Sequence, residues 1–161
     1  METSEPSFEE MVSEIGHELE NIDQLRAELK KVLGEEPVSS RRIKGSILHD
    51  FYNCCERVFR RISLGINGGF DLGEKWHKEL LHRMTIPIGD IRPQVISEEL
   101  AAELDDYLAF RHLFRNIYGF ELKGERLDRL VGKFERTSEA FKTEVGGFLA
   151  KMREKDSDQP L

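Results

Sequence analysis

The stretch FEEMVSEIGHELENIDQLRAELKKVL, which runs from Phe8 to Leu33, decides the class of fold. Its apolar residues recur about every seven positions, which places them on one stripe of an α-helix. Ser7 and Glu10 stand three residues apart in the order of a capping box, and Gly34 suits the end of the helix. The sequence therefore predicts an amphipathic helix from about residue 8 to residue 33. Its stripe consists of Phe8, Met11, Ile15, Leu19, Ile22, Leu25, Leu29 and Leu33.

The same periodicity continues along the chain and predicts four further helices. A last long helix is expected at about 124–153, where Leu127, Phe134, Phe141 and Phe148 recur every seven residues. The others are expected from residue 39 or 40 to about residue 62, at 73–84 and at 97–118, with Ser97 as the cap of the fourth. Prolines and a glycine predict an irregular loop at 85–96. The stripe of the second helix consists of Ile43, Ile47, Phe51, Cys54, Val58 and Ile62.

These elements predict an all-α fold: an up-and-down bundle of four long helices plus one short helix. The chain has 161 residues, which is enough for one domain with its own core. We expect that single helical domain to span residues 1–155, followed by a frayed tail at 156–161.

Composition excludes several classes of protein. The formal charge is −7, which argues against a broadly basic nucleic-acid binder. No apolar run approaches the roughly 18–20 residues of a membrane span, and the acidic N-terminus is unlike a signal peptide. The adjacent residues Cys54 and Cys55 are interpreted as small helix residues in a reducing compartment, so we expect a cytoplasmic protein with no membrane partner.

The charge is nevertheless uneven along the chain. Residues 1–36 hold 11 acids and 3 bases, a net of −8, so the remaining residues sum to +1. Residues 37–62 hold 2 acids and 6 bases, a net of +4, from Arg41, Arg42, Lys44, Arg57, Arg60 and Arg61. That basic cluster either offers phosphate contacts or pairs with the acidic first helix. Total charge thus leaves room for a small, local phosphate site.

Arg111 is the most informative single residue. Leu104, Arg111 and Tyr118 are spaced by seven, so the arginine falls in the middle of an apolar stripe. A guanidinium that points inward needs a partner, because an unpaired buried charge is very costly. Two interpretations stay open: an anion or phosphate site, or a structural salt bridge to an acid such as Asp50 or Glu56.

The segment Arg111-His112-Leu113-Phe114-Arg115-Asn116-Ile117-Tyr118-Gly119-Phe120-Glu121-Leu122 resembles the signature of HepT-like proteins of the HEPN superfamily. That signature is Arg, four residues, His, one residue and Tyr, often continued as Gly-Phe-Glu-Leu. Leu48–Tyr52 with Glu56 and Arg57 resembles the second helix of the family, and Trp76–Leu81 and Arg92-Pro93 fit as well. The resemblance covers roughly residues 40–130.

The resemblance implies a helical homodimer that acts as a toxin. Proteins of this kind are similar to metal-independent endoribonucleases, in which Arg steadies the phosphate and His is the acid or base while the RNA 2′-hydroxyl attacks. The partner implied is a nucleotidyltransferase antitoxin of the MntA type, which adds AMP to the motif tyrosine. Carried over to this sequence, the catalytic set is Arg111, Asn116 and Tyr118, and Tyr118 is the AMPylation site.

Asn116 departs from the signature, which has His at this position. An amide cannot serve as a general acid or base, but it can form hydrogen bonds to a phosphate or ribose. Three readings stay open: a weakened or inactive homologue, an engineered change that lets a toxin be expressed, or compensation by another histidine, of which His112 is the nearest. Asn116 and His112 lie about 140° and about 100° from Arg111 around an ideal helix.

Other candidate residues complete the predicted site. Arg115, His112, Arg57 and Asp50 are candidate phosphate or RNA contacts. Two Glu-x-x-His pairs, at residues 14 and 17 and at residues 79 and 82, are interpreted as solvated polar faces rather than as a di-iron site. We therefore expect no metal and no cofactor.

The function predicted from the sequence is a HEPN-type endoribonuclease toxin neutralised by a nucleotidyltransferase. The alternative is a non-catalytic helical module of the same fold that binds a nucleotide or a partner protein. A purely structural helical protein is the third reading.

Overall fold

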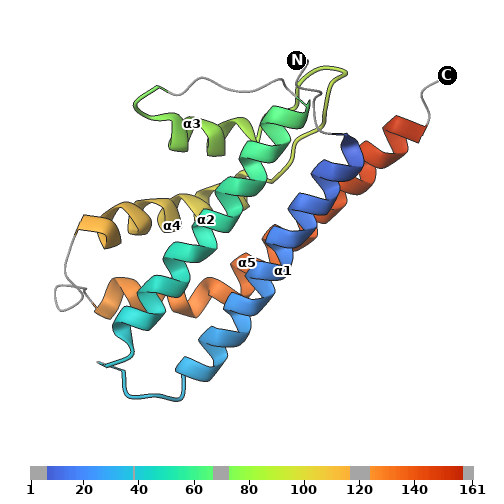
Figure 1. Cartoon of the computed structure of the whole chain (residues 1–161). Coiled ribbons are helices and arrows are strands. Elements are labelled where there is room, and N and C mark those ends of the chain that lie inside the picture. The colour runs from blue at the N-terminus through green and yellow to red at the C-terminus, as the bar shows by residue number, and fades with distance from the viewer. Residues whose placement is uncertain (1–6, 38, 67–72, 117–123, 158–161) are drawn as a thin grey trace, which may run out of the picture.

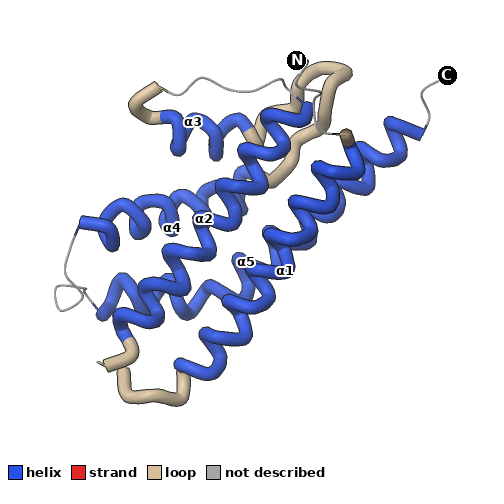
Figure 2. Tube along the Cα trace, viewed as in Figure 1, coloured by secondary structure: helices blue, strands red, loops and turns tan. Residues whose placement is uncertain are grey.

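The computed structural model describes residues 7–37, 39–66, 73–116 and 124–157. The described residues form five α-helices: α1 (Phe8–Val32), α2 (Arg41–Ile66), α3 (Trp76–Arg83), α4 (Glu98–Asn116) and α5 (Gly124–Ser157). No strand occurs among them (Figure 2), apart from an isolated bridge between Ile88 and Arg92. The all-α prediction of four long helices and one short one is confirmed.

The long helices pack as a bundle around α2 (Figure 1). The chain descends α1, returns along α2, and later runs back along α5 beside α1. Helix α4 packs against α2 and α5, and the short α3 contacts both α2 and α4. Helices α2, α3 and α4, which follow one another in the chain, therefore all contact each other.

An aromatic core holds α2, α4 and α5 together. The ring of Phe51 packs edge-on against Tyr107, Phe134 and Phe141, with centroids 5.2, 5.0 and 6.4 Å away. Such edge-to-face contacts suit the quadrupoles of the rings. The buried hydroxyl of Tyr107 donates to the Leu130 carbonyl oxygen at 2.7 Å, so its polar atom is satisfied. This core sets the position of α4 relative to α2.

The predicted starts of α1 and α4 are confirmed. The Ser7 side chain accepts from the backbone N–H of Glu10, and the Glu10 carboxylate accepts from that of Ser7, which completes the capping box of α1. The hydroxyl of Ser97 accepts from the backbone N–H of Leu100 at 3.1 Å and caps α4.

The loop between α3 and α4 is irregular, as predicted, but it is well held. Arg92 is 1% exposed, and its guanidinium donates to the carbonyl oxygens of Arg83, Ile86 and Pro93 at 3.0 Å each. The backbone N–H groups of Val95 and Ile96 donate to the carbonyl oxygen of Met84. These bonds fix α3 against the start of α4.

Several helix details differ from the prediction. Helix α3 begins at Trp76 rather than at residue 73, and Leu33, which the sequence places in the stripe of the first helix, is 53% exposed. Ile43 is 47% exposed whereas Ile47 is 3% exposed, so the apolar burial of α2 begins one turn after the helix does. Helix α2 continues to Ile66, and α5 continues to Ser157, because these polar and small residues extend a helix already propagated from the core. The predicted end of the fourth helix, at residue 118, lies outside the described residues.

Both cysteines are buried and free, which fits the predicted role as small helix residues. Burial raises the pKa of Cys54 to about 12 and that of Cys55 well above its ordinary value. Within the described ranges, no helix has the length and apolar character needed to cross a membrane.

Candidate functional site

Arg111 lies buried where α4 meets α2. Its side chain is 5% exposed, and it faces the carboxylate of Glu56, which is 10% exposed. Nη1 donates to Oε1 of Glu56 at 3.2 Å, and Nη2 donates to Oε2 at 3.0 Å, a two-pronged ion pair. Nη1 also donates to Oδ1 of Asn53 at 2.9 Å. Of the two interpretations of Arg111, an anion site or a salt bridge within the chain, the structure shows the salt bridge, with Glu56 as the acid.

Tyr52 covers another side of the guanidinium. The Arg111 guanidinium carbon lies 4.9 Å from the centre of the Tyr52 ring, within the range of a cation–π contact. Burial raises the pKa of Tyr52 well above its ordinary value. In the part of the chain that the structure describes, the buried Tyr52 hydroxyl has no hydrogen-bond partner.

His77 joins this cluster from α3. Its Nδ1 lies 2.7 Å from Oε2 of Glu56 and 3.0 Å from Nη2 of Arg111. The carboxylate accepts and the guanidinium donates, so Nδ1 can form a hydrogen bond to only one of them. We assign the proton to Nδ1, because the contact with Glu56 is the shorter and Nη2 already donates to Glu56; the approach of Nη2 to Nδ1 is then not a hydrogen bond. The His77 side chain is 35% exposed, so one edge of the buried cluster reaches the surface.

Asn53 extends the cluster toward His49. The Asn53 side chain accepts from Arg111, and its Nδ2 lies 3.3 Å from Nδ1 of His49. The His49 ring packs on Phe114 of α4, with centroids 5.6 Å apart. We call Asn53, Glu56, His77 and Arg111 the Arg111 cluster, and His49 lies at its edge.

The other predicted residues of α4 lie outside the cluster. Asn116 is exposed, and its Nδ2 donates to the carbonyl oxygen of His112, one turn earlier, at 2.7 Å. The side chains of His112 and Arg115 are exposed as well. The predicted modification site, Tyr118, lies outside the described residues.

Asp50 and Arg57 interact with residues other than Arg111. Asp50 is exposed, and its Oδ1 lies 3.5 Å from Nδ1 of His49. Arg57 donates from Nε to Oε1 of Glu18 at 2.9 Å. Thus Glu56, rather than Asp50, is the acid that pairs with Arg111.

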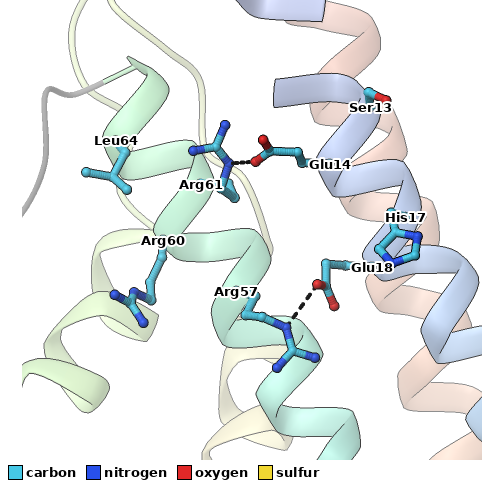
Figure 3. Close-up of a pocket in the computed structure, with 8 residues that line it drawn as sticks. All are labelled: Ser13, Glu14, His17, Glu18, Arg57, Arg60, Arg61 and Leu64. Atoms are coloured by element: carbon cyan, nitrogen blue, oxygen red, sulfur yellow. Dashed lines mark hydrogen bonds and ion pairs between the residues drawn. The ribbon is translucent and has the colours of Figure 1, made fainter. Parts of the chain in front are cut away.

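Part of the basic cluster of α2 faces the acidic first helix (Figure 3). Arg57 pairs with Glu18 and Arg61 pairs with Glu14, across a groove of about 630 Å³ between α1 and α2. Arg60 points away from α1 in the same view and lies over the Trp76 ring, 5.4 Å from its centre. The charge pattern allowed this basic cluster either to contact phosphate or to pair with the acidic first helix. Arg57 and Arg61 pair with that helix.

The Glu-x-x-His pairs do not converge on a metal site. Glu14 and His17 of the first pair, and Glu79 and His82 of the second, are all exposed. Among the described residues, no group of three or more metal-ligating side chains is found.

Sequence reasoning did not single out His77 or Asn53 as site residues. Asn53 and Glu56 stand three residues apart, so they share a face of α2. That spacing indicates that Asn53 can lie beside the acid that pairs with Arg111. His77 gave a weaker signal, since only the fold brings α3 beside Glu56.

A scan against family models matches residues 44–152 to a model described as HepT-like protein. The match spans more than half of the chain. The chain belongs to the HepT-like family. This family is part of the HEPN superfamily, so the predicted resemblance is confirmed. Searches of curated proteins and of solved structures gave no match.

The family match places the Arg111 cluster in the shared part of the HepT-like chain. Residues 44–152 include most of α2 and α5 and all of α3 and α4, and with them Asn53, Glu56, His77 and Arg111. Helix α1 falls outside the match, although it packs along α2. The acidic helix that pairs with Arg57 and Arg61 thus lies outside the matched residues.

Proposed function

We propose that this HepT-like chain is a HEPN-type, metal-independent endoribonuclease and the toxin of a toxin–antitoxin pair. The observation that carries the proposal is the cluster of Glu56, His77 and Arg111, in which a carboxylate orients an imidazole beside a guanidinium. Oriented imidazoles are the usual proton-transfer groups of enzymes at neutral pH. The cluster lies against α4, the helix that carries the motif arginine.

The motif residues take different roles in this proposal. Arg111, which is buried and paired, acts as a positioning residue that holds Glu56 and His77 in place. Asn116 is exposed and offers an amide that can form hydrogen bonds to a phosphate or a ribose. The exposed side chains of His112 and Arg115 lie on the same helix end and are proposed contacts for RNA.

The proposed partners are a second copy of the chain and a nucleotidyltransferase antitoxin. A homodimer would place two α4 helix ends near one cleft, so that residues of both copies face one RNA strand. The antitoxin would act on Tyr118, whose hydroxyl attacks the α-phosphorus of ATP. The Tyr–O–P bond forms, pyrophosphate leaves, and the phenolic proton passes to solvent. A bulky, anionic AMP group two residues after Asn116 in the chain would oppose the approach of RNA by charge and by volume.

Incubation with an MntA-type nucleotidyltransferase and ATP is expected to add one AMP to the wild-type chain. The Tyr118→Phe variant is expected to gain none, because it lacks the attacking hydroxyl. Intact-mass spectrometry measures both, and the Tyr52→Phe variant is the matched control, since that hydroxyl is buried. The AMPylated chain is also expected to lose RNA cleavage. Modification of Tyr118→Phe to the wild-type extent would contradict the assigned site.

A second candidate function is a non-catalytic module of the same fold that binds a partner protein. Two observations favour it: the Asn116 amide already donates to its own helix, and Arg111 is neutralised by Glu56. If this second function is correct, we expect the chain to bind the nucleotidyltransferase tightly and to cleave no RNA. A cleavage assay on the purified chain separates the two.

A further inference from the structure

We propose that His77 is the proton-transfer residue of this chain and takes the place of the histidine that the motif lacks. The inference deepens the proposed RNA cleavage and rests on it. The sequence directed attention to His112, the neighbour of Arg111, as the substitute. The structure instead brings a histidine from another helix to the guanidinium, with His77 Nδ1 only 3.0 Å from Arg111 Nη2.

The five histidines differ in what holds them. His17, His82 and His112 are exposed. His49 lies 3.5 Å from the exposed Asp50, which is a loose contact. His77 lies 2.7 Å from Glu56, whose carboxylate is itself fixed by two bonds from Arg111. Of these side chains, His77 is the one that a buried carboxylate orients at hydrogen-bond distance.

This contact determines which ring nitrogen is free for chemistry. With the proton assigned to Nδ1, which donates to Glu56 at 2.7 Å, Nε2 of the neutral ring carries the lone pair. In the described part of the chain, Nε2 forms no hydrogen bond, and the side chain is 35% exposed. A base that is held at one nitrogen and open at the other is the arrangement that general base catalysis needs.

The surroundings of His77 suit a polyanion with stacked bases. Trp76 packs against the imidazole, with ring centroids 3.6 Å apart, and the Arg60 guanidinium lies over the Trp76 ring. Arg60 is exposed, and α1 offers it no acid of the kind that pairs with Arg57 and Arg61 (Figure 3). A cation for phosphate and an aromatic ring for a base thus lie beside the free edge of His77.

The reaction step is a transesterification within the RNA. Nε2 of His77 takes the proton of a 2′-hydroxyl, whose oxygen forms a bond to the adjacent phosphorus. The bond from phosphorus to the 5′-oxygen breaks, and that oxygen leaves with a proton from water. The products are a 2′,3′-cyclic phosphate and a 5′-hydroxyl, and the imidazolium returns its proton to the hydroxide formed. Glu56 stabilises the transient imidazolium.

The test compares His77→Asn with the wild-type chain and with His82→Asn. Asparagine places an N–H donor near the position of Nδ1, so it keeps the bond to Glu56 and removes only the base. His82 lies on the same helix and is exposed, which makes it the matched control. The single-turnover rate of RNA cleavage is measured in the presence of EDTA. The dissociation constant is measured with a 2′-O-methyl RNA, which cannot react, and circular dichroism checks that each variant is folded.

His77→Asn is expected to lower the cleavage rate by about 10²–10⁴-fold and to leave the dissociation constant unchanged. His82→Asn is expected to keep the wild-type rate. His77→Gln serves in the same comparison if the Asn variant does not fold. If the wild-type chain cleaves RNA and a folded His77 variant cleaves it at the same rate, the role of His77 is overturned and the proposed function stands. A wild-type chain that cleaves no RNA would overturn both.

Discussion

Replacing Glu56 by alanine is expected to lower the free energy of unfolding by about 3–5 kcal/mol. The side chain of Arg111 is 5% exposed, and two of its hydrogen bonds end on Glu56. Without that carboxylate, the buried guanidinium keeps Asn53 and the Tyr52 ring, which carry no compensating charge. Urea unfolding followed by circular dichroism measures the loss.

Glu9→Ala is the control for this expectation. Glu9 pairs with Arg153, and both side chains are more than half exposed, so its loss is expected to cost about 0–1 kcal/mol. The double change Glu56→Leu with Arg111→Met removes both charges and is expected to recover most of the stability. A Glu56→Ala chain as stable as the Glu9→Ala chain would show that the buried pair does not hold α4 to α2.

Placing histidine at position 116 is expected to raise the rate of RNA cleavage by about 10²–10⁴-fold. Asn116 occupies the position at which the HepT-like signature has an acid or base, and its amide cannot donate a proton to the leaving 5′-oxygen. With His77 as the base, an imidazole at this position supplies the missing acid. Single-turnover cleavage in EDTA measures the change.

The Arg115→His variant is the matched control for the gain. It adds an exposed imidazole one position earlier, about 100° around the helix, so it tests position rather than mere presence of the ring. Its rate is expected to stay at or below that of the wild type. An equal gain in both variants, or no gain at Asn116→His, would contradict the assignment of position 116 to the cleft.

The helices could be predicted from the sequence because burial repeats along each of them. The phenylalanines of α5 and most of the α1 stripe are buried, as their spacing requires, and Leu19 of that stripe is partly buried. The need of Arg111 for an internal partner was equally predictable, since a charge on an apolar stripe must be compensated. Its partner, Glu56, is one of the two acids that the sequence offers for this role.

The geometry around His77 could not be predicted in the same way. Residue 77 is 21 positions from Glu56, and its helix has only eight residues, too few to show a clear stripe. Its placement depends on the loop fixed by the buried Arg92, whose bonds to backbone carbonyls follow no periodic pattern. The exposure of Ile43 likewise depends on where neighbouring helices end, which local spacing does not encode.

The pairing of Arg57 and Arg61 shows how packing decides between two readings of a charge pattern. The same basic cluster could face phosphate or the acidic first helix, and sequence alone gave both equal standing. Because α1 packs along α2, Glu14 and Glu18 reach these arginines, while the guanidinium of Arg60, at the edge of the same groove, lies over the Trp76 ring. Within the basic cluster of α2, the proposed RNA contact is therefore Arg60, beside α3, rather than Arg57 or Arg61.

The most direct measurement is the chemical identity of the ends left when the purified chain meets RNA in the presence of EDTA. Mass spectrometry of a ribo-oligonucleotide should show fragments with a 2′,3′-cyclic phosphate and a 5′-hydroxyl, and the 2′-O-methyl form of the same oligonucleotide should stay intact. That result is expected if the 2′-hydroxyl is the nucleophile and the Arg111 cluster orients its base. Intact RNA with both the wild-type chain and its Asn116→His variant would contradict the ribonuclease assignment.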